Sequence, residues 1–416
     1  MSSQIVNQDP TGYRLGGRMP SVVWAPADRA ETVDAIRSAA SAGQSLVIWG
    51  GGTAIDLGFP PERYHAALST AHLNRVIDYQ PDDMTITLEP GVRLSTLQAL
   101  LAERRQFLPL NPALPDRVTV GGLVSAASSG PWRAGYGTPR DWVIGLRVIG
   151  ADGLEVRAGG LVVKNVAGYD LPKLYTGSHG TLGLLTEVTF KVLPMPPAVG
   201  HALIELSGAT EVENVLARLR DSDVDPCVVS LLHGSGVPSI QLPTRADWTL
   251  LLEFRHFPEA VRWQLDQLAT ASGIPPDRIH ELSAGETVVG AVRDLGIHSP
   301  FLCRASTLSS RAAALCREFR ELGHASGAEL TCVSQAASGQ ISVFGSPGCH
   351  SGLVQRLRGV ARQVGGNLVA ARVPEDWIGE VDPWGDPGAA FRLISGIKQT
   401  LDPTGLFAPG RMAGRV

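Results

Sequence analysis

The sequence has little that would tie the protein to a metal, a membrane or a nucleic acid. Its five cysteines all lie in the second half of the chain, and none forms the Cys-x-x-Cys pair typical of zinc and iron–sulfur sites. No run of about 18 apolar residues could cross a membrane, and residues 1–10 lack the apolar segment of a signal peptide. We therefore expect a reduced chain with buried thiols, located in the cytoplasm.

A large excess of charge of one sign is also missing. The net charge of −4 argues against a surface that binds nucleic acid. The strand expected at 46–48 is not followed by Gly-x-Gly-x-x-Gly, which argues against a Rossmann dinucleotide site there. Because 416 residues are too many for one compact core, and because 44% are hydrophobic and 18% charged, we expect two globular domains.

Glycine, by contrast, is abundant and falls into three clusters that each follow an apolar segment. The clusters lie at 50–52, at 119–122 and within 164–183, where glycine occupies positions 168, 177, 180 and 183. Glycine lets the backbone turn tightly and come close to a ligand. Three such loops predict one extended ligand, such as a dinucleotide, held by backbone N–H groups.

The first part of the chain reads as short strands mixed with helices. A capping box from Asp28 to Glu31 begins a helix that Gly43 ends. Further expected elements are strands at 46–48, 84–88 and 188–192, a helix from 94 to about 106, and a hairpin over 142–157. The proline-rich run 194–197 can continue neither a helix nor a central strand, so it marks a domain boundary.

The second part predicts an antiparallel sheet with helices on one face. The expected strands are 202–206, 227–232, 248–254, 329–334, 340–344 and 368–373, and the expected helices are 210–221, 258–271, 309–325 and 350–363. A last helix is expected at about 388–401. No internal repeat and no low-complexity tract is recognisable.

Four stretches carry a joint pattern that is more specific than any one glycine loop. They are Trp24-Ala25-Pro26 leading to Gly50-Gly51-Gly52-Thr53, then 68–91 with Glu89-Pro90-Gly91, then 108–141 with Thr119–Gly122, and finally 164–194. This pattern resembles flavoproteins of the vanillyl-alcohol oxidase type, which carry the PCMH-type FAD-binding domain. Within that family it is most similar to the FAD-binding small subunits of bacterial glycolate oxidases. The likeness is dense over 15–197, returns at 400–411 and is weak in between.

The resemblance implies an α+β fold in three parts. A two-part PCMH-type FAD-binding domain would span 15–197. A cap or substrate domain, with an antiparallel sheet flanked by helices, would span 198–375, and a C-terminal segment at 376–416 would return to the FAD domain.

The resemblance also implies FAD as the cofactor. The loop at 50–53 would wrap the pyrophosphate, the 119–129 segment would line the path to the flavin ring, and 177–183 would press against the cofactor from the other side. The residues expected to bind FAD are Gly50, Gly51, Gly52, Thr53, Thr119, Val120, Gly121, Gly122, Ser125, Ser129, Gly137, Gly177, Gly180, Thr181, Gly183 and Arg411.

Each of these features has a plainer interpretation. The 50–53 and 119–122 loops could each be a structural turn, and only their joint occurrence favours the cofactor. His179 is interpreted as loop structure, with contact to cofactor or substrate as the alternative. Asp402 and Pro403 are interpreted as a helix stop with an indirect link to the cofactor.

Two departures from the family pattern qualify the implied chemistry. Some members attach FAD covalently through His or Cys, but 49–54 reads Trp-Gly-Gly-Gly-Thr-Ala and 128–130 reads Ser-Ser-Gly, so non-covalent FAD is expected. Larger catalytic subunits and D-lactate dehydrogenases carry His-x-Gly-Asp-Gly-Asn, which supplies metal ligands and a candidate base. Here only Gly365-Gly366-Asn367 remains, so we assign no metal site and no catalytic residue.

Three functions remain open at this point. The first is an FAD-binding subunit of a complex that oxidises glycolate, a 2-hydroxy acid, to glyoxylate. Its partners would be a larger FAD-binding catalytic subunit and an iron–sulfur subunit, and the membrane would be reached only through the complex. The second is a free-standing FAD-dependent dehydrogenase of another hydroxylated substrate, with its base in the cap. The third is a non-catalytic subunit whose FAD relays electrons.

Overall fold

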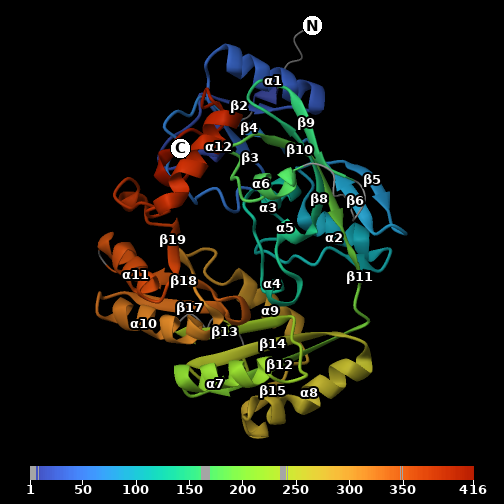
Figure 1. The fold of residues 1–416 in the computed structure, drawn as a ribbon, viewed down its shortest axis with the longest axis vertical. Helices are drawn as coiled ribbons and strands as arrows, with labels where there is room; N and C mark the ends of the chain where they lie inside the picture. Colours follow the sequence, from blue (N-terminus) through green and yellow to red (C-terminus); the bar gives the residue numbers. More distant parts are fainter. Residues whose placement is uncertain are drawn as a thin grey trace. The chain divides into compact units, whose positions relative to one another are not determined.

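The chain forms two compact units in a computed structural model (Figure 1). The structure describes residues 6–7, 9–160, 169–234, 240, 242–346, 348 and 350–416. Within these, unit 1 takes 1–129, 138–195 and 383–416, whereas unit 2 takes 130–137 and 196–382. The chain therefore leaves unit 1 twice, first for residues 130–137 and then for residues 196–382.

Unit 1 contains a mixed four-stranded sheet and an antiparallel five-stranded sheet. The order of the first is β1-β2-β4-β3, with β2, β4 and β3 parallel, and the order of the second is β5-β6-β10-β8-β9. The strands are β1 Val6–Asn7, β2 Val22–Ala25, β3 Leu46–Trp49, β4 Ala66–Ser69, β5 Val76–Gln80, β6 Thr85–Leu88, β8 Val143–Ile149, β9 Glu155–Gly159 and β10 Leu184–Lys191. The helices are α1 Arg29–Ser41, α2 Leu94–Ala102, α3 Val120–Ser125, α5 Pro139–Trp142, α6 Leu171–Tyr175 and α12 Phe391–Leu401.

The first helix forms as its capping box predicts. The Asp28 carboxylate accepts a hydrogen bond from the Glu31 backbone N–H at 3.0 Å, and the Glu31 carboxylate accepts one from the Ala27 N–H at 2.8 Å. Ala35 and Ile36 then pack into a fully buried core with strands β3 and β4. Helix α2 is shorter than expected because Gln106–Phe107 form strand β7, which pairs with β11, Leu193–Pro194.

The C-terminal segment joins the first sheet beside β3. The Leu46 N–H donates to the Leu406 carbonyl, and the Ala408 N–H donates to the Leu46 carbonyl, both at 2.7 Å. Phe407 lies fully buried between these bonds, in the core that α1 covers. Residues at opposite ends of the sequence therefore share one core.

Unit 2 is built on one antiparallel sheet of eight strands. The order is β15-β12-β14-β13-β17-β18-β16-β19. The strands are β12 Ala198–Leu206, β13 Val228–Gly234, β14 Trp248–His256, β15 Ile279–Glu281, β16 Phe301–Ser306, β17 Glu329–Gln335, β18 Gln340–Ser346 and β19 Asn367–Arg372. The helices are α4 Arg133–Tyr136, α7 Ala209–Arg220, α8 Pro258–Ser272, α9 Gly285–Asp294, α10 Ala312–His324 and α11 Gly352–Gln363.

The sheet of unit 2 consists of two halves with the same topology. Each half runs strand, helix, strand, strand, helix, strand, and each places its fourth strand beside its first, then its third, then its second. The second strands, β13 and β17, pair at the centre of the sheet. The expectation that the chain has no internal repeat is therefore wrong for topology. This topology requires only a pattern of buried and exposed positions, and many different side chains can satisfy that pattern. The two halves therefore have no sequence identity by which the repeat could be recognised.

Unit 2 also differs from the sequence-based expectation in where its helices lie. Helices α7, α8, α10 and α11 bury their apolar side chains in one core on one face of the sheet, as expected. Helix α9 was not predicted, and it packs Val288 and Val292 against Leu232 and Leu251 in a separate cluster. Because Leu251 alternates with core residues along β14, α9 covers the opposite face. Strands β15 and β16 were also missed.

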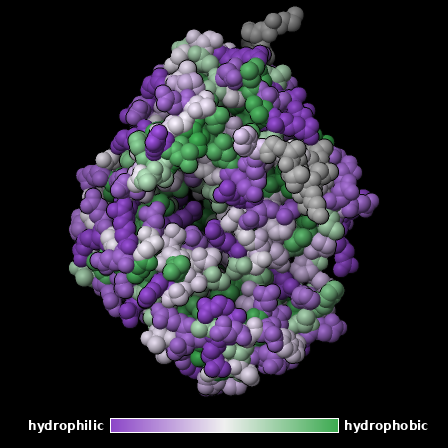
Figure 2. All heavy atoms as spheres, in the orientation of Figure 1, coloured by the Kyte–Doolittle hydropathy of each residue, from purple (hydrophilic) through white to green (hydrophobic). Residues whose placement is uncertain are grey.

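The described residues contain no helix long and apolar enough to span a membrane. On the face of the molecule in Figure 2, hydrophilic and hydrophobic residues are interspersed. Four cysteines, Cys227, Cys303, Cys316 and Cys332, are buried free thiols, and the fifth, Cys349, lies outside the described residues.

Candidate functional site

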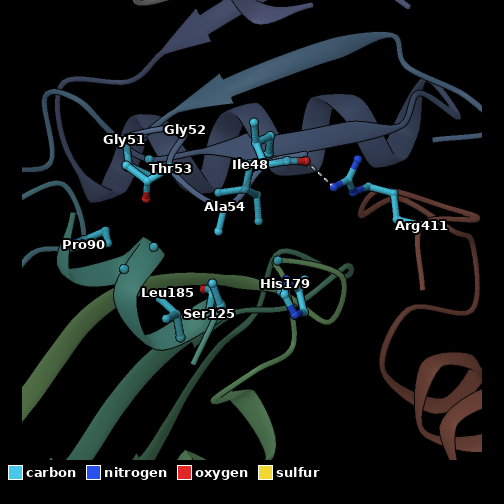
Figure 3. Close-up of a pocket in the computed structure, with 18 residues that line it drawn as sticks. Ile48, Gly51, Gly52, Thr53, Ala54, Pro90, Ser125, His179, Leu185 and Arg411 are labelled. Atoms are coloured by element: carbon cyan, nitrogen blue, oxygen red, sulfur yellow. Dashed lines mark hydrogen bonds between the residues drawn. The ribbon is translucent and has the colours of Figure 1, made fainter. Parts of the chain in front are cut away.

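A pocket in unit 1 brings together loops that are distant in the sequence (Figure 3). The loop after β3 forms one wall, helix α3 and the turn before β10 form the facing wall, and Arg411 closes one end. The lining residues are Ile48, Gly50, Gly51, Gly52, Thr53, Ala54, Ile55, Thr70, Pro90, Gly121, Gly122, Ser125, Ala126, His179, Gly180, Gly183, Leu185 and Arg411.

The loop at 50–53 offers unused backbone donors. Gly51, Gly52 and Thr53 are partly buried, yet their N–H groups form no hydrogen bond with any residue in the described part of the chain. Gly51 also has to be glycine, because a Cβ there would lie 1.7 Å from the Arg117 carbonyl oxygen. Partly buried N–H groups without partners suit the oxygens of an anionic ligand such as a pyrophosphate.

The glycines at 121 and 122 serve a different purpose. The Val120 and Gly121 N–H groups donate to the carbonyls of Val92 and Pro90, and the Gly122 N–H donates to the Thr119 hydroxyl at 3.3 Å. The donors of this turn are therefore already used within the protein. A Cβ on Gly121 would lie 2.6 Å from the Pro90 Cβ, so glycine here permits close packing of α3 on the 89–91 turn.

The turn at 177–183 also uses some of its backbone donors within the protein. Its His179 N–H donates to the Ser125 carbonyl at 2.8 Å, which fixes the turn against helix α3. His179 has a positive φ of 53° and its ring meets the Trp384 ring edge-on at 5.3 Å. Its side chain lines the pocket (Figure 3). The simpler interpretation of His179 as loop structure alone therefore misses its place at the site.

Two buried cations in the C-terminal segment hold the pocket walls. The Lys398 ammonium donates to the Thr181 carbonyl at 2.7 Å, to the Asp402 carboxylate at 2.6 Å and to the Phe407 carbonyl at 2.8 Å. The Asp402 carboxylate also accepts from the Leu406 and Phe407 N–H groups, both at 2.8 Å. Asp402 is thus more than a helix stop, because it anchors the segment that carries Arg411.

Arg411 supports the loop after β3 from the other end of the pocket. Its guanidinium donates to the Ile55 and Leu57 carbonyls, both at 2.7 Å, and the bond to Ile55 is the dashed line in Figure 3. Burial lowers the pKa of Arg411 to about 10, with Asp56 opposing the shift. The guanidinium therefore remains charged at neutral pH, with part of its donor capacity consumed by the loop.

The structure gathers ten of the sixteen predicted residues around this pocket. These are Gly50, Gly51, Gly52, Thr53, Gly121, Gly122, Ser125, Gly180, Gly183 and Arg411. Four others, Thr119, Val120, Gly177 and Thr181, do not line the pocket and lie beside residues that do. Ser129 does not line it either, and Gly137 belongs to unit 2. Gly168, in the stretch with the most glycines, lies outside the described residues.

The pocket also contains residues that the sequence analysis did not assign to the site. Ile48, Ala54, Ile55 and Leu185 supply apolar wall, and Thr70 and Pro90 come from 68–91, the second of the four stretches that carry the family pattern. The signal for Thr70 and Pro90 was present, since their stretch carried the family pattern. Apolar wall residues give no such signal, because they look like any core position.

Unit 2 carries a separate buried ionisable cluster on β12 and β14. The Glu253 carboxylate is 1% exposed and lies 3.0 Å from the His201 Nε2, and the Cys227 thiol donates to it at 3.4 Å. Burial raises the pKa of Glu253, but hydrogen bonds from His201 and Arg255 outweigh burial, so the net pKa is lowered. The cluster is internally paired. Among the described residues, no group of three or more His, Cys, Asp or Glu side chains could hold a metal ion.

Comparisons with known proteins agree with this geometry. A family described as FAD binding domain matches residues 20–159. The chain is 30% identical to glycolate oxidase subunit GlcE of Escherichia coli (strain K12), over 81% of this chain and 84% of that protein. It is also 30% identical to glycolate oxidase subunit GlcD of Bacillus subtilis (strain 168), over 56% of this chain and 51% of that protein.

A solved structure shares the fold over nearly the whole chain. The crystal structure of p-cresol methylhydroxylase with substrate bound superposes with a TM-score of 0.73 at 16% identity, covering 94% of this chain and 88% of that one. At this identity the likeness shows the fold alone. It confirms the expected PCMH-type architecture with its second unit built on an antiparallel sheet.

Proposed function

Because the chain belongs to the family of FAD-binding oxidoreductases that includes the glycolate oxidase subunits, we propose that it is the FAD-binding subunit of a glycolate-oxidase-like complex. The complex would oxidise glycolate, a 2-hydroxy acid, to glyoxylate and pass the electrons to an iron–sulfur partner subunit. A larger FAD-binding catalytic subunit would complete it.

One observation carries the assignment of the cofactor to this pocket. The three N–H groups at 51–53 are partly buried and have no partner among the described residues, whereas the facing N–H groups of Gly121 and Gly122 are bonded within the protein. Desolvated donors of this kind cost free energy unless a ligand accepts their hydrogen bonds. The FAD pyrophosphate is an anion of the right kind for them.

The surrounding residues would orient and enclose the cofactor. Gly180 and Gly183 keep side-chain atoms out of the wall opposite the 50–53 loop, and Ile48 and Leu185 provide apolar surface that excludes water. Lys398 and Arg411 hold the two walls in place through backbone carbonyls. When bound, FAD would supply the two-electron acceptor for oxidation of the substrate.

We propose that FAD is bound without a covalent link. The 49–54 loop carries no histidine or cysteine, but His179 lines the pocket and is the lining residue that could form such a link. Acid precipitation of the purified yellow protein separates the two cases. Non-covalent FAD stays in the supernatant. Flavin in the pellet that disappears in His179→Ala would overturn this part of the proposal.

The names of the relatives support the expectation of partner subunits. The names of GlcE and GlcD describe subunits, so we expect this chain to co-purify with a larger flavoprotein and an iron–sulfur protein. A cytoplasmic location, with membrane contact only through the complex, stays a prediction. Affinity purification from the native organism, followed by iron and flavin analysis, tests both partners.

The decisive experiment is an anaerobic titration of the purified chain with glycolate, followed in the visible flavin band. We expect a yellow protein that stays oxidised with glycolate, is bleached by dithionite, and gains glycolate-dependent reduction when the partner subunits are added. Bleaching by glycolate without partners would instead favour a free-standing dehydrogenase. If glycolate did not reduce the flavin even in the complex, the result would favour a non-catalytic subunit whose FAD relays electrons. A colourless protein that cannot be reconstituted with FAD would contradict the cofactor assignment itself.

A further inference from the structure

The residue that leads into the 50–53 loop is a tryptophan whose ring is buried against that loop. Trp49 ends β3 and is 8% exposed. It shares a small core with Tyr64, on the face of the first sheet opposite the core that α1 covers. A Cβ on Gly52 would lie 3.4 Å from the Trp49 ring. The indole is therefore within van der Waals reach of the loop whose N–H groups at 51–53 are unpaired among the described residues.

One buried hydroxyl fixes the orientation of this indole. The Trp49 Nε1–H donates to the Tyr64 hydroxyl at 2.8 Å, and that hydroxyl donates to the Tyr13 carbonyl, also at 2.8 Å. The Tyr13 ring meets the Trp49 ring edge-on, with 5.1 Å between the centroids. Burial raises the pKa of Tyr64, so the hydroxyl keeps the proton that it donates. Turning the indole would leave its N–H buried without an acceptor.

The backbone of Trp49 is held as firmly as its ring. The Trp49 carbonyl accepts from the Thr70 N–H at 2.9 Å and from the Thr70 hydroxyl at 3.1 Å. Thr70 itself lines the pocket. A run of glycines has little stiffness of its own, so the positions of the N–H groups at 51–53 depend on the residue that anchors the run.

We propose that Tyr64 is a positioning residue for the FAD pyrophosphate, and that it acts through the Trp49 indole on the N–H groups at 51–53. Neither Tyr64 nor Trp49 lines the pocket, so the role is to support the loop and not to contact the cofactor. A loop that already holds its bound conformation loses less entropy when the ligand arrives, which strengthens binding. The identity of the ligand as FAD rests on the proposed function.

The test measures FAD binding to the full-length protein after removal of its flavin, by quenching of FAD fluorescence. Tyr64→Phe leaves the Trp49 N–H buried without an acceptor, and we expect FAD affinity to fall about 5- to 10-fold. Tyr79→Phe is the matched control. It removes another hydroxyl of unit 1, which donates to the Gln106 side chain at 2.9 Å and does not line the pocket, so it should leave FAD affinity unchanged.

A second variant tests the route through the indole. Trp49→Phe removes the N–H and leaves the bond between Tyr64 and Tyr13 in place. In that background Tyr64→Phe should lower FAD affinity no further, because the group that it would orphan is gone. An equal fall in both backgrounds would overturn the route through Trp49. If Tyr64→Phe does not fold, Trp49→Phe alone tests the link, and wild-type FAD affinity in this variant would overturn it.

Phosphorus NMR of the bound cofactor separates positioning from a purely structural role. We expect the pyrophosphate resonances of FAD to shift in Tyr64→Phe, while the visible flavin band keeps its position. Urea unfolding of the flavin-free protein records any loss of stability independently. A variant that is less stable, yet binds FAD with wild-type affinity and unshifted phosphorus resonances, would overturn the proposal.

The wild-type protein in the same experiment separates this proposal from the proposed function. Wild-type protein that binds FAD, with no dependence on Tyr64, keeps the flavoprotein assignment and loses the positioning role. Wild-type protein that cannot be loaded with FAD would overturn the cofactor assignment and the positioning role together.

Discussion

The two units present their polar groups in opposite ways. Unit 1 offers backbone N–H groups of a glycine loop, and its buried cations Lys398 and Arg411 are occupied by backbone carbonyls. Unit 2 holds side-chain charges on a rigid sheet, where His201 and Glu253 are paired. Backbone donors depend on loop conformation, whereas strand-borne charges depend on side-chain identity. The units should therefore respond to different kinds of mutation.

The largest effect on FAD affinity is expected for Gly51→Ala in unit 1. The added Cβ would lie 1.7 Å from the Arg117 carbonyl oxygen, so the loop backbone itself has to move and its N–H groups lose their positions. We expect FAD affinity to fall at least about tenfold, which corresponds to about 1.4 kcal/mol, as measured by quenching of FAD fluorescence on titration. Unchanged affinity would mean that the donors at 51–53 do not hold the cofactor.

The second prediction concerns the buried tie between the C-terminal segment and the pocket. Lys398→Met leaves the Asp402 carboxylate buried without its cation, which should cost about 3–5 kcal/mol in the free energy of unfolding. Lys173→Met is the matched control, since it breaks an exposed Lys–Asp pair in the same unit that is worth about 0–1 kcal/mol. Urea unfolding of the two variants measures the difference, and equal losses would contradict a structural role for the buried pair.

The third prediction uses pH to test how the stability of unit 2 depends on the charge of a buried side chain. Burial lowers the pKa of His233 from 6.5 to about 4, with Arg320 also lowering it and Asp247 opposing. Between these values the unfolded chain binds a proton that the folded chain does not, so stability falls as pH falls from about 6.5 to about 4. The expected loss is about 3 kcal/mol.

Urea unfolding at neutral pH and near pH 4 measures this loss, with His233→Gln as the comparison. The variant has no titrating ring, so it should lose less stability over the same range. A variant as acid-sensitive as the wild type would show that another group, outside the His233–Trp248 stack, controls the response.

The smallest effect is expected for Gly122→Ala, in the turn whose donors are already used. The added Cβ meets only the Thr119 Oγ1, at 3.1 Å, and alanine favours the helix more than glycine does by about 1 kcal/mol. We expect the free energy of unfolding to change by less than about 1 kcal/mol and FAD affinity to fall less than in Gly51→Ala. A larger loss of affinity than in Gly51→Ala would reverse our ranking of the two loops.

Local patterns in the sequence predicted most of the individual elements. The capping box at Asp28, the proline run at 194–197 and the apolar alternation of the later strands all mark features that the structure contains. Helix α9 and strand β16 were missed because each mixes small or charged residues with apolar ones, so their periodicity is weak without the sheet that buries them.

The candidate site was predicted in part, for a related reason. Glycine loops can be recognised in a sequence because few other residues allow their conformations. Ten of the predicted residues line the pocket. The sequence could not show that the donors at 51–53 stay unpaired while those at 120–122 are used. That distinction depends on carbonyls contributed by Val92 and Pro90, which are remote in the chain.

The sequence by itself determined the family, the cofactor class and the local elements, because these follow from short motifs whose backbone or side-chain chemistry admits few alternatives. Tertiary structure alone decided three further features. It paired the two halves of the unit 2 sheet, it tied Lys398 to Thr181, and it joined the Trp49 indole through Tyr64 to the Tyr13 carbonyl. Each of these depends on which distant strands and carbonyls meet, and that is settled by packing the whole chain rather than by any local run of residues.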